Sequence, residues 1–149
     1  MSTLADPRVR AALRERIRRL DPKAAAKWGR MQAPQMVCHL NDSFRVGLGE
    51  KYASPASSAL QRTVVKWVAL RAPFRWPPGV PTRPEIEQGR GGTPPAEWES
   101  DCRELLGLVD TFAECQTFGA HPVFGRMNRR DWLAWGYRHV DHHLRQFGV

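Results

Sequence analysis

Two histidines four residues apart, His139 and His143, lie near the C-terminal end of the chain. Side chains at this spacing project from one side of a helix, so both imidazoles can reach the same metal ion. On a helical wheel at about 100° per residue, the pair falls in an apolar sector formed by Trp132, Trp135, Gly136, Val140, Leu144 and Phe147. An unsatisfied buried imidazole is costly, so the rings must find hydrogen-bond partners or share a cation. The spacing favours a ligand pair over two satisfied core histidines.

A metal site needs at least a third ligand, and the remaining histidines are His39, His121 and His142. His142 falls at the edge of the apolar sector and is expected to point elsewhere. His121 lies in a loop punctuated by Pro122 and Gly125. His39 flanks the apolar stripe of an expected helix and can reach the edge of the core.

Hydrophobic periodicity predicts an all-α chain without a convincing alternating strand. Helices are expected over residues 7–20, 34–47, 55–70, 95–118 and 128–147, each opened by a proline or a capping residue. In the third helix the side chains expected to face inward are Leu60, Val64, Trp67 and Val68. Residues 71–94 hold six prolines, which predicts a long connection. We interpret this connection as a crossover linker, with a lid over a pocket as the alternative.

Four main helices with a long connection in the middle are typical of a four-helix bundle, whose core is where metal sites are built from facing helices. His39 on the second helix and the pair His139 and His143 on the last helix fit that arrangement. The sequence does not determine whether these two helices face each other.

Length and composition predict one globular domain, 1–149, because 42% of the residues are hydrophobic. No apolar run approaches the roughly 20 residues that cross a bilayer, and the N-terminal residues lack the pattern of a signal peptide. We therefore expect a cytoplasmic protein without a membrane partner. Cys38, Cys102 and Cys115 have no metal-knuckle or disulfide spacing and are expected to be reduced structural thiols.

The net charge of +8 raises the question of nucleic acid, because nine of the first 30 residues are basic. A basic helix can bind phosphate backbones non-specifically. However, Val9, Leu13, Ile17 and Leu20 follow its other side at helical spacing. This pattern indicates an ordinary amphipathic helix, and specific nucleic-acid binding is not expected.

The chain resembles the DinB-like superfamily, and within it a branch known as a domain of unknown function. The similarity spans nearly the whole chain and is most specific in the last 30 residues. It rests on Trp28, residues 34–40, the loop 121–125, residues 128–132 and residues 139–147. The resemblance implies a four-helix bundle of up-down-down-up order, often dimeric, with a metal held by three histidines. The positions that match this histidine pattern are His39, His139 and His143.

Other branches of that superfamily include thiol-dependent transferases and isomerases, and many members have no known reaction, so the resemblance does not name a substrate. Three neutral imidazoles suit a divalent metal such as Zn, Ni, Fe or Mn and leave a position open for water. Asp42 is expected to be a solvated helix residue, Asp141 to point away from the apolar sector, and Tyr137 and Arg145 to lie on the surface. Catalytic residues are therefore left unassigned.

Three classes of function stay open at the level of sequence. The first is a metal-dependent enzyme, a hydrolase or a thiol transferase, that acts on a small-molecule substrate. The second is a non-catalytic helical bundle in which the histidines form a structural or vestigial site, and the third is a non-specific nucleic-acid binder. We also expect a homodimer, because six tryptophans are many for one narrow core and large aromatic side chains are favoured at interfaces.

Overall fold

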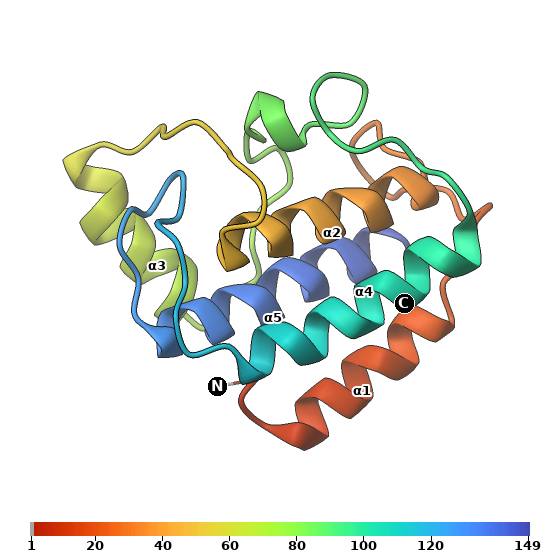
Figure 1. Cartoon of the computed structure of the whole chain (residues 1–149), viewed down its shortest axis with the longest axis horizontal. Coiled ribbons are helices and arrows are strands. Elements are labelled where there is room, and N and C mark those ends of the chain that lie inside the picture. Colours follow the sequence, from red (N-terminus) through yellow and green to blue (C-terminus); the bar gives the residue numbers. More distant parts are fainter. Residues whose placement is uncertain (1) are drawn as a thin grey trace.

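The computed structural model describes residues 2–149, and it is built from helices joined by loops (Figure 1). No β-strand occurs among these residues, which confirms the predicted all-α class. The helices are α1 (Pro7–Arg18), α2 (Ala33–Leu48), α3 (Lys66–Arg71), α4 (Trp98–Glu114) and α5 (Arg129–Gln146). A π-helical turn, η1 (Gln61–Val65), leads directly into α3, and a short 3-10 turn, η2 (Pro84–Ile86), interrupts the long connection.

The starts of α1 and α5 follow from their capping residues. The Asp6 side chain accepts a hydrogen bond from the backbone N–H of Arg8, and Pro7 opens the first turn of α1. The Asn128 side chain likewise accepts from the backbone N–H of Asp131 at 2.8 Å. Each cap satisfies a backbone donor that the helix itself leaves without a partner. Both starts agree with the sequence prediction.

The helix predicted over 95–118 is shorter than expected. It begins at Trp98 because the Glu97 carboxylate caps it, accepting from the backbone N–H groups of Glu99 and Ser100. It ends at Glu114, because Cys115 adopts an extended backbone with ψ of 135°. The two prolines before Ala96 therefore lie in the connection rather than in the first helical turn.

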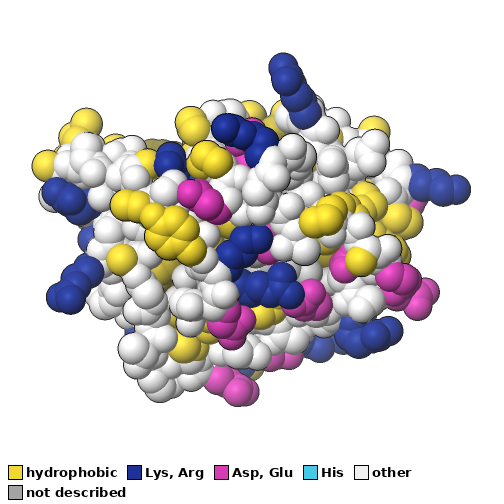
Figure 2. Space-filling model, turned by 45° about the horizontal axis from the view of Figure 1, so that its top comes forward, with side chains coloured by type: hydrophobic (Ala, Val, Ile, Leu, Met, Phe, Trp, Pro, Cys, Tyr) yellow, Lys and Arg dark blue, Asp and Glu magenta, His cyan; other side chains and the backbone are white. Residues whose placement is uncertain are grey.

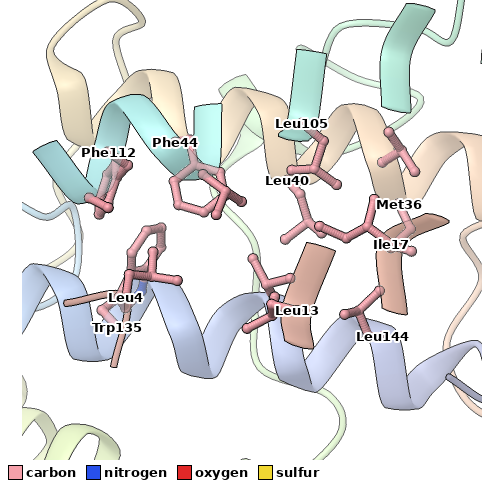
Figure 3. Close-up of a cluster of buried hydrophobic side chains, with 14 of the residues drawn as sticks. Leu4, Leu13, Ile17, Met36, Leu40, Phe44, Leu105, Phe112, Trp135 and Leu144 are labelled. Carbon is pink, nitrogen blue, oxygen red and sulfur yellow. The ribbon is translucent and has the colours of Figure 1, made fainter. Parts of the chain in front are cut away.

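Helices α1, α2, α4 and α5 lie side by side, and α3 lies at one end of the molecule (Figure 1). Their facing sides bury one continuous apolar core, to which Leu4 also contributes from the N-terminal segment. Figure 3 shows how side chains of this core meet between the four helices: Leu4, Leu13, Ile17, Met36, Leu40, Phe44, Leu105, Phe112, Trp135 and Leu144. Each helix contributes residues at three- or four-residue spacing, as an amphipathic helix facing a core should.

Two glycines allow close packing in this core. A Cβ atom at Gly136 would lie 2.7 Å from Leu4 Cδ1, and one at Gly47 would lie 2.7 Å from Phe112 Cε2. Such distances are too short for carbon atoms that are not bonded to each other, so a side chain at either position would require the packed side chains of Leu4 or Phe112 to shift.

The prediction for the third helix is wrong in two respects. The helical segment does not begin at Pro55, because residues 52–58 have no regular structure. Three of the four residues expected to face inward, Leu60, Val64 and Trp67, are instead 61%, 56% and 63% exposed. The periodicity does define an apolar face, but no other helix covers most of it. α3 contacts α5 and buries Leu70 in its last turn.

Asp42 also contradicts its prediction, since its carboxylate is fully buried rather than solvated. Its oxygens accept hydrogen bonds from the backbone N–H and the hydroxyl of Thr93, each at 2.7 Å. Lys51 and Arg45 provide the opposite charges, with Lys51 Nζ 3.0 Å away. Buried carboxylates are stable in proteins when paired and hydrogen-bonded in this way. Asp42 thus anchors the end of the long connection to α2.

Two arginines of the basic face of α1 form ion pairs with other helices of the molecule. Arg14 forms an ion pair with Asp110 on α4, and Arg16 with Asp141 on α5 at 2.8 Å. These contacts account for two of the cations that suggested nucleic acid. Within residues 2–149, no helix combines the length and apolar character needed to cross a bilayer.

Candidate metal centre

Three histidine side chains converge between α2 and α5. His139 Nε2 lies 3.2 Å from His39 Nε2 and 3.2 Å from His143 Nε2. The ligand atoms of all three lie within 4.8 Å of one another. The structure therefore brings together the three histidines that the sequence singled out, because α2 and α5 do face each other.

Hydrogen bonds at the opposite ring nitrogens orient two of these imidazoles. His39 Nδ1–H donates to the backbone carbonyl of Ile86 at 3.1 Å, and His143 Nδ1–H donates to Gln146 Oε1 at 2.8 Å. The Gln146 amide is fixed in turn, because its Nε2 donates to the carbonyl of Trp28 at 2.7 Å. Once Nδ1 carries the proton of a neutral imidazole, Nε2 presents a lone pair. Both rings therefore direct lone pairs toward His139.

Burial keeps these imidazoles neutral. Desolvation lowers the pKa of His39, and it holds the pKa values of His139 and His143 well below the usual range, with further repulsion from the neighbouring histidines. Neutral imidazole is the form that coordinates metal ions. The cluster is consequently in its metal-binding protonation state at neutral pH.

The distances between the Nε2 atoms suit coordination of a single metal ion. Ligands about 2.0 to 2.1 Å from a tetrahedral zinc ion are separated from each other by about 3.3 Å, close to the 3.2 Å contacts of His139. Without a cation, His139 Nε2–H can donate to only one of the two lone pairs that face it. A cation that accepts all three lone pairs resolves this conflict, so the donor set fits a divalent metal.

The long connection forms part of the centre. It supplies the Ile86 carbonyl that orients His39, and its Trp76 ring lies 6.0 Å from the ring of His139. Trp76 is fixed by a hydrogen bond from Nε1 to the carbonyl of Ala69. From α5, the ring of Trp135 packs 4.8 Å from that of His139. The predicted linker therefore wraps the bundle and also forms one wall of the histidine cluster.

The other two histidines lie outside the cluster. The His142 ring lies 5.1 Å from that of His143, near Trp28 and Trp76, and its Nδ1 has no hydrogen-bond partner among residues 2–149. His121 packs against aromatic rings in its loop, and burial lowers its pKa to about 3. His121 Nδ1 accepts hydrogen bonds from the backbone N–H groups of Val123 and Phe124. This histidine therefore holds the loop together.

No carboxylate or thiol joins the three histidines within the described part of the chain. Asp141 lies on another side of α5, where it pairs with Arg16 and Arg145. The three cysteines are free thiols, as predicted, and burial raises the pKa of Cys38 to about 12 and of Cys102 to about 11. These two thiols are protonated and unreactive at neutral pH. Tyr137 and Arg145, expected on the surface, are half-buried.

Sequence reasoning missed the residues that support the histidines. Gln146 follows His143 by three residues, a spacing at which helical side chains meet, so this contact could have been predicted. The carbonyl of Ile86 and the ring of Trp76 carry no such signal. They reach the cluster only through the path of the long connection.

Comparison with known proteins gives a family but no function. No curated protein and no solved structure matches the chain. One family profile matches residues 7–148, which include all five helices and the three clustered histidines. The chain therefore belongs to the family described as "Protein of unknown function (DUF1569)".

Proposed function

We propose that this protein binds one divalent first-row metal ion through His39, His139 and His143. The observation that carries the proposal is the convergence of the Nε2 atoms of the three histidines. In His39 and His143, a hydrogen bond donated by Nδ1–H leaves a lone pair on Nε2 that points into the cluster. Zn, Ni, Fe and Mn all accept this ligand set.

We further propose that the family belongs to the DinB-like superfamily, with its helices in up-down-down-up order. In Figure 1, α1 and α5 run in one direction and α2 and α4 in the other, which supports this order. Neighbouring helices that run the same way, such as α2 and α4, need a connection that returns along the bundle. Residues 49–97 are long enough to provide it.

The class of function we favour is a metal-dependent enzyme, a hydrolase or a thiol-dependent transferase. A divalent ion held by these three imidazoles would supply Lewis acidity if a fourth coordination position is open to a substrate or water. His39 and His143 would hold such an ion with rings oriented by their hydrogen bonds to Ile86 and Gln146, and the rings of Trp76 and Trp135 would lie beside it, next to His139. The alternative is a structural site, which is favoured by the way the cluster joins α2, α5 and the long connection.

Metal analysis of protein purified without a metal-affinity column tests the ligand set. We expect about one divalent ion per chain, lost in His143→Gln and retained in His142→Gln. The two substitutions are adjacent in the sequence, and only the first removes a member of the cluster. Circular dichroism checks that both variants fold. A metal-free wild type, or equal metal content in the two variants, would contradict the proposal.

Cobalt substitution separates the enzyme from the structural site. The visible spectrum of Co²⁺ reports its ligands, so a small thiol or azide that enters an open position changes the spectrum. We expect such a change in the wild type. A cobalt spectrum that stays constant at saturating thiol and azide would show that the fourth position is closed, and would favour the structural alternative.

A further inference from the structure

Residues 51–84, which we call the cationic arm, run from the end of α2 through α3 to the start of η2. They contain six Lys or Arg residues and no Asp or Glu. All the large hydrophobic side chains that are exposed in residues 2–149 also lie in this stretch: Tyr52, Leu60, Val64, Val65, Trp67, Phe74 and Val80. Exposed apolar and exposed cationic side chains therefore coincide in one segment.

The centre of the arm is the helical segment formed by η1 and α3. Leu60, Val64 and Trp67 follow each other at spacings of four and three residues, and all three are more than half exposed. This spacing places them on one face. Trp67 is the only exposed tryptophan in the described chain, because the other five are buried or half-buried. A helical face of this kind normally has a partner.

Four of the six cations of the arm form no ion pair within residues 2–149, and one of these four, Arg83, is held by hydrogen bonds to Ser54. Lys51 pairs with Asp42 and Arg71 with Asp131. Arg62, Lys66 and Arg75 form no ion pair with any residue among 2–149, and they lie in η1, in α3 and just after it. At the left end of Figure 2, where α3 lies, hydrophobic and basic side chains gather and no acidic side chain is visible in this view.

A groove of about 520 Å³ extends this cationic character from the arm onto α5. The exposed ring of Phe74 lies at its border, and four arginines line it: Arg71, Arg75, Arg138 and Arg145. Asp141 is the one acidic residue among those that line the groove, and Arg16 and Arg145 already neutralise it. Arg71 is paired with Asp131, and Arg138 donates to the backbone carbonyls of Ala72 and Phe74. Arg75 is therefore the arginine of the groove that is left, among residues 2–149, to meet an anionic group.

We propose that the cationic arm docks this protein on the surface of an anionic lipid bilayer. A face with an exposed tryptophan and leucine, flanked by Lys and Arg, is suited to lie in a membrane interface, where apolar side chains insert and cations meet the phosphates. This attachment is peripheral and needs no membrane-spanning helix. It goes beyond the metal site and does not depend on it, and it differs from the sequence-based expectation of no membrane partner.

A second copy of the chain is a weaker candidate for the same face. A two-fold contact would place the arms of both protomers against each other, and neither arm contains an acidic residue to compensate Arg62, Lys66 or Arg75. The repulsion acts on a chain whose net charge is already +8. Charge complementarity therefore favours an anionic surface over self-association.

Vesicle co-sedimentation of the full chain tests the proposal, with phosphatidylcholine alone and with phosphatidylcholine mixed with phosphatidylglycerol. We expect binding to the mixed vesicles only, weakening as salt screens the charges. Arg62→Gln/Lys66→Gln should lower the partition coefficient about tenfold or more. Arg19→Gln/Arg103→Gln is the matched control. Arg19 lies at the C-terminal end of α1 and Arg103 in α4, and both are exposed cations that form no ion pair within residues 2–149. This variant should change binding far less.

The apolar face needs its own measurement. Val64→Ser/Trp67→Ser should abolish binding while leaving the melting temperature nearly unchanged, because both side chains are mostly exposed. In the wild type, lipids that carry a spin-label quencher should quench part of the tryptophan fluorescence, and Trp67→Phe should lose that quenched part.

Three results would overturn the proposal. The first is the absence of binding to mixed vesicles at low salt, and the second is binding that the arm variants and the control variant reduce equally. The third is a dimer in sedimentation equilibrium that Val64→Ser/Trp67→Ser dissociates, with no vesicle binding. That outcome would assign the face to a second copy of this chain.

Discussion

Two helical segments of this protein, α5 and the segment formed by η1 and α3, have the same kind of apolar periodicity, but the apolar face is buried in the first and exposed in the second. In both, apolar residues recur at three- and four-residue spacing. α5 contacts α1, α2, α3 and α4, and its Leu144 is fully buried. The other segment lies at the end of the molecule, and its Leu60 is 61% exposed. Periodicity therefore predicts which residues share a face, but not whether another element covers that face.

A matched pair of substitutions measures this difference directly. Leu144→Ala should lower the free energy of unfolding by about 2 to 5 kcal/mol, because it removes buried methyl groups and leaves a cavity. Leu60→Ala should change it by less than about 0.5 kcal/mol, since an exposed side chain loses little on truncation. Urea denaturation of both variants gives the comparison. Equal losses would mean that the η1–α3 face is covered in solution.

Metal removal tests the buried region of α5 in another way. A ligand at about 100 times its dissociation constant stabilises the folded state by about 2.7 kcal/mol. We therefore expect a chelator to lower the melting temperature of the wild type and to leave that of His139→Gln unchanged. A chelator effect of equal size in both proteins would place the bound metal elsewhere. The η1–α3 segment has no comparable cluster, so Trp67→Phe should keep the full effect.

Substitution of Asp42 and of Arg75 compares the contribution of a buried charge to stability with that of an exposed charge of the cationic arm. Asp42→Ala removes the acceptor of two hydrogen bonds from Thr93 and the partner of Lys51. We expect a loss of about 2 to 3 kcal/mol, measured by urea denaturation. Arg75→Gln, on the arm, should stay within about 0.5 kcal/mol. A neutral effect of Asp42→Ala would show that Thr93 does not need this anchor.

The pH dependence of stability probes the loop next to α5. Burial lowers the pKa of His121 to about 3, while an unfolded histidine titrates near 6.5. The stability that comes from the neutral ring is therefore complete above pH 6.5 and is lost as the pH falls toward 3. Between pH 8 and pH 5 the loss from this group should reach about 2 kcal/mol.

His121→Phe isolates this contribution. The phenyl ring keeps the aromatic packing and cannot bind a proton, although it loses the two backbone hydrogen bonds to Nδ1. The variant should be less stable than the wild type at pH 8 and should lose less stability on acidification. Parallel pH profiles for the two proteins would show that His121 does not titrate with a lowered pKa.

The sequence by itself determined the helical class, most helix starts and the pairing of His139 with His143. These features depend on local interactions, namely caps within one turn and side chains one turn apart. It also separated His142 from the pair, because a wheel position follows from residue number alone. Gln146 lay within reach of the same reasoning.

Only the tertiary structure decided that His39 meets that pair, that Ile86 and Trp76 reach the cluster, and that Asp42 is buried. Each of these contacts joins residues far apart in the chain, and their approach depends on how the long connection returns along the bundle. The exposure of Leu60, Val64 and Trp67 has the same origin. The sequence of a helix determines which residues form its apolar face. Burial of that face requires a second surface, and the position of that surface depends on the rest of the fold.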